Sequence, residues 1–189
     1  MELFRNLRIK AGRSTLAGKI SKVNRRPYYT NFRSVKSMGL VWDASRPEEF
    51  MLLSRFHQKM SEHNIEFRIL GLFPGKVLPN QFTAVRYLTC LRKNEIDFFY
   101  RPDSKDATVF IEKQFDVLID INFQKLFPLV YITTLSRARF KVGLADAEPE
   151  KSPFDLMLSI NKPVNIENYL EQIILYLDMI NSESSKKAV

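Results

Sequence analysis

Residues 39–73 have the sequence GLVWDASRPEEFMLLSRFHQKMSEHNIEFRILGLF. The first four residues form a short apolar run that ends at Asp43, as expected of a buried strand. Residues 45–48, SRPE, match a capping box with proline in the first turn, and apolar residues then recur at helical spacing as far as Asn64. Residues 65–73 form a second apolar run, which ends before a Pro-Gly pair. A strand, a capped helix and a strand in this order predict a βαβ unit with parallel strands and a right-handed crossover.

The rest of the chain continues the alternation of strands and helices. The most strand-like segment is residues 115–121, FDVLIDI, a continuous apolar run of the kind that is buried on both faces of a sheet. Further strands are predicted at 84–91, 140–143 and 154–160, and helices at 104–114, 128–138 and 166–180. We therefore expect an α/β fold, a three-layer Rossmann-like sandwich with a mostly parallel sheet, over residues 38–181. Residues 182–189 are polar and are expected to form a flexible tail.

The composition favours a cytoplasmic domain without catalytic chemistry. A chain of 189 residues with 45% apolar residues is long enough for one packed core. Its single cysteine, Cys90, has no disulfide partner within the chain, and no apolar stretch suits a secretory signal or a membrane helix. The glycines form no phosphate-binding motif, and His57 and His63 lack partners at metal-ligand spacing. We predict no catalytic residue, no metal and no cofactor, and the question of enzyme activity stays open with the motifs favouring a noncatalytic protein.

The positive charge is concentrated in the first 37 residues. They contain ten basic residues and one acidic residue, a net charge of +9, whereas the whole chain carries +8. Residues 3–20 predict a weakly amphipathic helix, which Gly12 and Gly18 interrupt. Residues 21–36 have no apolar period and mix arginines with aromatic residues, so we expect an extended arm. Residues 1–37 are therefore predicted to form a basic helix and arm that meet a polyanion.

RNA is the polyanion that this basic segment fits best. Lysine and arginine neutralise phosphates, and aromatic rings between them stack on unpaired bases. We expect contacts with RNA or ribosomal particles through Arg5, Arg8, Lys10, Arg13, Lys19, Lys22, Arg25, Arg26, Tyr28, Tyr29, Phe32 and Arg33. Two alternatives stay open, an anionic membrane surface as the partner and a solvated arm whose apolar residues dock on the body. A second basic run at residues 137–141, RARFK, is interpreted as a solvated edge.

A second class of function is suggested by polar residues at the ends of predicted strands. In an open α/β sheet, ligands bind beyond the carboxyl ends of the strands. Asp43, Ser45, Asp120 and Asn122 fall at such ends and are candidate ligand-binding residues for a small molecule. The alternative is that Asp43 only terminates a strand and Asp120 only caps a turn.

Three segments carry a resemblance to known sequences: residues 115–122 (FDVLIDIN), residues 127–129 (FPL) and residues 135–143 (LSRARFKVG). They are similar to an uncharacterised family of Bacteroidota proteins of about this length, which implies a fold but no activity. The first and third segments also resemble the acceptor-side half of heptosyltransferase-like enzymes, where an F-D-x-x-I-D strand precedes a helix and an R-x-x-G strand start. In those enzymes a second domain holds the nucleotide-sugar donor, and we expect no such domain within these 189 residues, so this resemblance implies a degenerate transferase-like domain.

Overall fold

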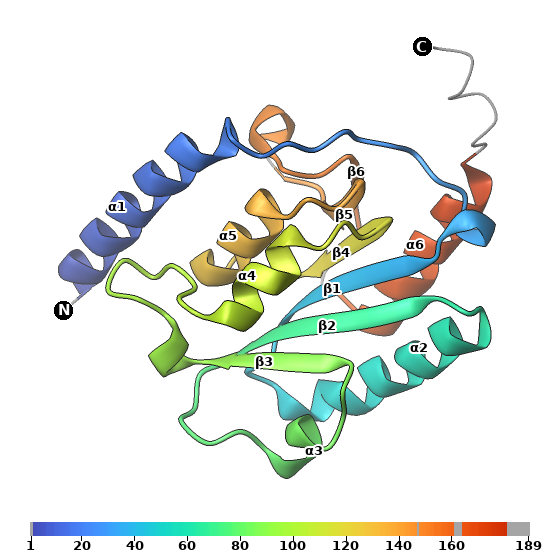
Figure 1. Ribbon diagram of the computed structural model, residues 1–189, viewed down its shortest axis with the longest axis horizontal. Coiled ribbons are helices and arrows are strands. Elements are labelled where there is room, and N and C mark those ends of the chain that lie inside the picture. The colour runs from blue at the N-terminus through green and yellow to red at the C-terminus, as the bar shows by residue number, and fades with distance from the viewer. Residues whose placement is uncertain (1, 147, 161–163, 181–189) are drawn as a thin grey trace.

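The computed structural model describes residues 2–146, 148–160 and 164–180, in which a six-stranded sheet forms the centre of the molecule (Figure 1). All paired strands are parallel and lie in the order β3-β2-β1-β4-β5-β6. Their bounds are Ser37–Asp43 (β1), Glu66–Phe73 (β2), Leu88–Arg92 (β3), Val117–Ile121 (β4), Phe140–Leu144 (β5) and Leu156–Leu158 (β6). The predicted α/β class is confirmed, with the strand order of a doubly wound Rossmann-type sheet. The tail predicted at 182–189 lies outside the described residues.

Helices cover both faces of the sheet and complete the three layers. The helices are α1 (Glu2–Ile20), α2 (Phe50–Glu62), α3 (Asn80–Thr83), α4 (Lys105–Glu112), α5 (Phe127–Leu135) and α6 (Ile166–Met179). α2, α3 and α6 pack on one face, and α4 and α5 pack on the other (Figure 1). The strand order reverses between β1 and β4, which is where sheets of this type bind ligands beyond the carboxyl edge.

β4 is the best-predicted element because its sequence is apolar on both faces. All five of its residues are buried. Val117 and Ile119 belong to the core beneath α2 and α6, whereas Leu118 belongs to the core beneath α4 and α5. Successive side chains of a strand point to opposite faces, so Asp120 faces the same layer as Leu118.

Two local predictions around the βαβ unit are wrong. Residues 47–49 form a short 3-10 helix before α2, and Ser45 does not cap it; its N–H donates to Asp43 Oδ1 at 3.1 Å instead. The predicted capping box fails because the amide of Ser45, which the side chain of Glu48 would have to engage, is bonded to Asp43 in this turn at the end of β1. The strand predicted from residue 84 begins only at Leu88, because Ala84 is the C-cap of the one-turn helix α3 and pairing with β2 starts at Leu88.

α1 is the predicted N-terminal helix, and it packs on the outer surface of α5. Leu16 is buried there with Phe127 and Tyr131. Gly12 lies at the closest approach, because a Cβ added to it would lie 2.7 Å from a ring carbon of Phe127 and would collide with the carbonyl oxygen of Phe99. The glycine that weakens the helix prediction is thus the residue that permits docking.

The arm of residues 21–36 follows the surface of the body rather than extending into solvent (Figure 1). The Tyr28 N–H donates to the carbonyl oxygen of Arg139 at 3.0 Å. Asn31 Nδ2 donates to the carbonyl oxygen of Asp178 at the end of α6. Phe32 is buried in the core beneath α2 and α6. The arm therefore joins α1, on one side of the sheet, to α6 on the other.

Candidate functional site

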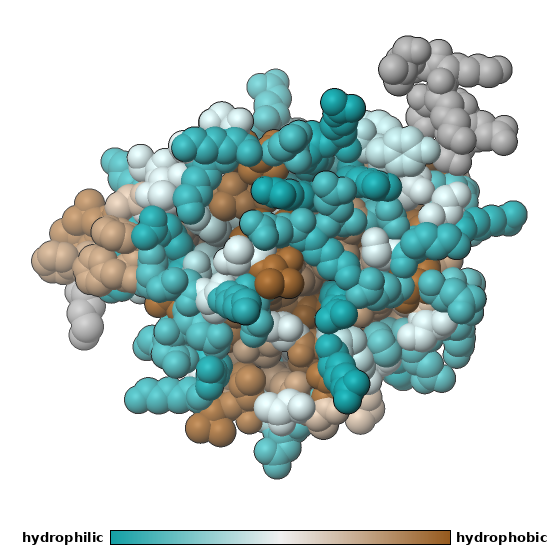
Figure 2. Space-filling model, viewed as in Figure 1, coloured by the Kyte–Doolittle hydropathy of each residue, from teal (hydrophilic) through white to brown (hydrophobic). Residues whose placement is uncertain are grey.

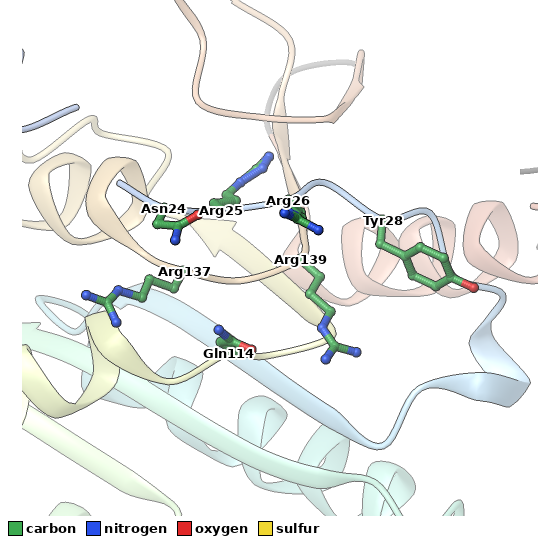
Figure 3. Close-up of a pocket in the computed structure, with 7 residues that line it drawn as sticks. All are labelled: Asn24, Arg25, Arg26, Tyr28, Gln114, Arg137 and Arg139. Carbon is green, nitrogen blue, oxygen red and sulfur yellow. The ribbon is translucent and has the colours of Figure 1, made fainter. Parts of the chain in front are cut away.

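A pocket of about 490 Å³ lies beside the amino ends of β4 and β5, where the docked arm passes over them (Figure 3). We call it the cationic pocket. It is lined by Asn24, Arg25, Arg26, Tyr28, Gln114, Arg137 and Arg139. Three separate segments contribute to it: the arm, the turn before β4, and the connection from α5 to β5.

The four arginines of the cationic pocket differ in how their charge is compensated. Arg25 turns away from Arg137 and Arg139 in Figure 3 and forms a bidentate ion pair with Asp155, in which both side chains are only 12% exposed. Arg139 lies 3.4 Å from Asp116 in an exposed pair. Arg26 and Arg137 have no acidic partner within the described part of the chain. The pocket thus carries an excess of positive charge, centred on those two side chains.

The other residues predicted to bind RNA do not gather at one place. Arg5 and Arg8 of α1 lie over the ring of Tyr100, and Arg8 also donates to the carbonyl oxygen of Phe98. Lys19 donates to the Tyr131 hydroxyl at 2.8 Å. The remaining cations, Lys10, Arg13, Lys22 and Arg33, are exposed on α1 and the arm. The cationic pocket therefore draws only Arg25, Arg26 and Tyr28 from the predicted set.

The aromatic residues of the arm are divided between surface and core. Tyr28 is 40% exposed and lines the cationic pocket. Tyr29 is exposed but rests against Phe140, with ring centroids 5.3 Å apart. Phe32 is buried and packs edge-on against His63, so its ring has no free face on which a base could stack. The prediction that Phe32 contacts RNA does not agree with this position.

A second cavity, of about 510 Å³, lies at the carboxyl ends of β4 and β5, where α1 crosses α5. We call it the carboxyl-edge cavity. Its walls include Leu16 and Ile20 of α1, Phe127 and Val130 of α5, and Phe154 of the connection to β6. The exposed charged residues Arg13, Lys125, Asp146 and Lys151 also line it.

Asp120 supplies a buried carboxylate to the carboxyl-edge cavity. Its carboxylate accepts a hydrogen bond from the Thr133 hydroxyl and another from the Asn122 N–H at 2.7 Å. No ion pair joins it to any cation among the described residues. Because burial disfavours the charged form, the pKa of Asp120 is raised to about 6, against the two hydrogen bonds that lower it.

The four residues predicted to bind a small molecule are only partly brought together. Asp120 and Asn122 line the carboxyl-edge cavity, whereas Asp43 and Ser45 are not part of its lining. Asp120 pairs with Val41 on the neighbouring strand, so Asp43 lies close in the sheet. Asp43 accepts from the Ser45 N–H in a turn of its own.

Lys141 departs from the interpretation of residues 137–141 as a solvated edge. It is only 2% exposed, and its ammonium donates to the carbonyl oxygen of Thr134 at 3.0 Å. Burial, reinforced by the positive charge of Arg25, lowers the pKa of Lys141 to about 7. Arg139 and Arg137, two and four residues before it, are exposed, because they lie in the connection between α5 and β5 and not in the strand.

Other chemistry-bearing residues have structural surroundings. Burial raises the pKa of Cys90 to about 12, which keeps its thiol protonated and unreactive at neutral pH. His57 stacks on Tyr87 with ring centroids 3.7 Å apart. Among the described residues, no group of three acidic, histidine or cysteine side chains is arranged to hold a metal ion, and no helix is long and apolar enough to cross a membrane.

Sequence reasoning missed several residues of both sites. Nothing in the sequence marks Asn24 and Gln114 as binding residues, since isolated amides occur on any protein surface. Arg137 had a signal, because it belongs to the second basic run, but nothing in the sequence joined that run to the arm. Thr133 lies on a predicted helix, thirteen residues after Asp120, and only the packing of α5 on β4 brings their side chains together.

The fold and the two cavities define a doubly wound α/β protein with an N-terminal helix docked on one outer layer. The chain belongs to a family of unknown function, DUF6913, which matches it over residues 8–180. This match spans the basic arm as well as the sheet. No curated protein and no solved structure matches the chain significantly.

Proposed function

We propose that the protein is a noncatalytic binding protein that contacts single-stranded RNA, alone or in ribosomal particles, through the cationic pocket. The observation that carries this proposal is the convergence of Arg26, Arg137 and Arg139, from segments more than a hundred residues apart, around one cavity. Guanidinium groups bind phosphate oxygens in a bidentate manner, and each such contact releases counterions.

The other residues of the cationic pocket suit an unpaired nucleotide. The ring of Tyr28 is exposed enough to stack on a base, and the amides of Asn24 and Gln114 can donate to and accept from a base edge. A cavity of about 490 Å³ has the size of a site for one small ligand, such as a single nucleotide, and is too small for a duplex. These features favour single-stranded over double-stranded RNA.

Salt-dependent binding of a short single-stranded RNA tests the proposal. The double variant Arg26→Gln/Arg137→Gln removes two phosphate contacts, so the slope of log K against log salt should become shallower by about 1.4. The matched control is Arg55→Gln/Lys59→Gln, which removes the same charge from α2 on the opposite face of the sheet. The proposal is refuted if the two double variants change the slope equally.

Point variants are preferable to deletion of residues 1–37. That deletion would also remove Phe32 and Val35, which are buried in the main core. Loss of RNA binding by the truncated chain would then report loss of folding. The four substitutions above are all on exposed side chains.

An anionic membrane surface is a second candidate partner, favoured by the free end of α1. Leu3, Phe4 and Leu7 are between 56% and 72% exposed there, and Figure 2 shows hydrophobic surface gathered over this end of the helix. Apolar side chains flanked by arginines are typical of helices that lie in a lipid headgroup region. Flotation with vesicles containing phosphatidylserine tests this, and the variant Phe4→Ser/Leu7→Ser should abolish it.

Three finer assignments rest on the sequence alone. They are a Bacteroidota origin, a cytoplasmic location and a degenerate likeness to the acceptor-side half of heptosyltransferase-like enzymes. The likeness rests on residues 115–120 and 139–143. RNA binding in the cytoplasm agrees with a chain that has one cysteine and no disulfide.

A further inference from the structure

The carboxyl-edge cavity contains a buried carboxylate, Asp120, that accepts hydrogen bonds but forms no ion pair with a cation of the described residues. Asp120 is 7% exposed and lines the cavity, and the Thr133 hydroxyl and the Asn122 N–H donate to its carboxylate. Buried carboxylates in proteins are normally paired with a cation, because an isolated charge is costly in a medium of low dielectric constant. Among the described residues, no cationic side chain pairs with the Asp120 carboxylate.

Every neighbouring charged or titratable group is engaged elsewhere or lies at the rim. Lys141, on the adjacent strand β5, donates to the carbonyl oxygen of Thr134. The Tyr169 hydroxyl of α6 donates to the backbone oxygen of Asp120, not to its carboxylate. At the rim, Lys125 pairs with Asp146 and Lys151 pairs with Glu148, while Arg13 projects from α1.

The walls of the cavity are apolar and aromatic. Phe127 and Phe154 contribute aromatic rings, and Leu16, Val130 and Leu144 contribute aliphatic side chains. Aromatic faces attract cations, and apolar walls bind the hydrocarbon part of a ligand. The volume of about 510 Å³ is that of a site for a small organic molecule.

We infer that the carboxyl-edge cavity binds a small organic ammonium compound, with its charged nitrogen against Asp120 and its apolar or aromatic part against Phe127 and Phe154. This site is separate from the cationic pocket, which lies at the opposite edge of the sheet. A ligand of this class supplies the missing positive charge and fills the apolar volume. An anionic or neutral ligand of equal size fills the apolar volume but brings no positive charge to Asp120.

Three probes of nearly equal shape separate these contributions. They are the phenethylammonium ion, the neutral alcohol 2-phenylethanol and the anion 3-phenylpropanoate, each measured by saturation-transfer NMR and titration on the full chain at pH 8. We expect the ammonium probe to bind at least about tenfold more tightly than the alcohol, since it makes a charge-assisted hydrogen bond. The anion should not bind. Equal affinity for the ammonium and the alcohol, preference for the anion, or no saturation transfer from any probe at millimolar concentration overturns the inference.

Two variants localise the binding. Asp120→Asn keeps the shape of the side chain and should abolish the preference for the ammonium probe, whereas Asp43→Asn, the same change on the neighbouring strand outside the cavity, should leave it intact. Val130→Trp fills the cavity from α5 and should block all binding. Preference retained in Asp120→Asn overturns the inference.

The pH dependence of the unaltered protein provides a test that needs no variant. With the pKa of Asp120 near 6, the ionised fraction falls about elevenfold from pH 8 to pH 5, and affinity for the ammonium probe should fall by about tenfold or more. Protonation of Lys141 over the same range acts in the same direction, because it adds positive charge near the cavity. Affinity that is constant or rises on acidification contradicts the inference. The Arg26→Gln/Arg137→Gln variant should bind the probe normally, so this test is independent of RNA binding.

Discussion

Replacing Gly12 with alanine tests the docking of α1 on α5, on which the carboxyl-edge cavity depends. In a helix free in solvent, Gly→Ala stabilises by about 0.5–1 kcal/mol, because glycine has more conformational entropy to lose. At position 12 the new methyl group would meet the ring of Phe127 at 2.7 Å and the backbone oxygen of Phe99, which cannot rotate away. Forcing extra volume into a packed contact costs about 1–3 kcal/mol.

We therefore expect Gly12→Ala to destabilise the protein by about 1–2 kcal/mol once the gain in helix propensity is subtracted. Gly18→Ala is the matched control on the same helix, since no atom lies within 4 Å of a Cβ added there. It should stabilise the protein by about 0.5–1 kcal/mol. The two substitutions thus differ in sign.

Urea unfolding gives the free-energy change of each variant, and hydrogen exchange of the α1 amides reports whether the helix stays docked. Gly12→Ala should also speed exchange in α1 more than in the sheet, because the clash is local. If both variants stabilise equally, α1 is not packed against α5 at Gly12, and the description of the carboxyl-edge cavity is incorrect.

Three further predictions concern buried charges. Arg25→Ala leaves Asp155 buried without its partner and should cost about 3–5 kcal/mol in unfolding free energy, whereas Arg26→Ala, on the next and exposed residue, should change it by less than about 0.5 kcal/mol. Folding raises the pKa of Asp120 from 3.8 to about 6, so the contribution of this group to the free energy of unfolding is complete below pH 3.8 and is lost as the pH rises through 6. The unaltered protein should therefore lose about 3 kcal/mol of stability over that range, and Asp120→Asn should not, as measured by urea unfolding at several pH values. Folding lowers the pKa of Lys141 from 10.5 to about 7, so the contribution of this group to the free energy of unfolding is present above pH 10.5 and is lost as the pH falls through 7. Between these pH values the unfolding free energy should rise by about 1.4 kcal/mol per pH unit, and Lys141→Met should abolish this slope. An unchanged slope in the variant would show that the lysine is solvated.

The parts of the fold that could be predicted from sequence are those in which local pattern and burial agree. Residues 115–121 are apolar without interruption, and β4 is buried on both faces. The order of strand, helix and strand in residues 39–73 predicts parallel pairing, and β1 and β2 are paired in this way. The capping box was mistaken because Ser45 has a competing bond to Asp43, two residues before it, which periodicity does not reveal.

The candidate sites were harder to predict because they depend on contacts between distant segments. The charge of the arm was evident, but its docking depends on Asp155 and on the backbone of Arg139. Phe32 has the composition of a stacking residue, and only the three-dimensional structure shows that it belongs to the core. Lys141 lies in a basic run, yet it belongs to β5, a strand that is buried on both faces of the sheet.

The attachment of the arm has a consequence for the order of events during synthesis. Residues 21–36 leave the ribosome early, but their partners Asp155 and Asp178 are made at least 130 residues later. At a translation rate of 5–20 residues per second, the delay is on the order of ten seconds. Throughout that interval Arg25 lacks its carboxylate partner, and it stays near the RNA of the particle that is making the chain. The body of the protein thus withdraws Arg25 from nearby polyanions only when translation is almost complete.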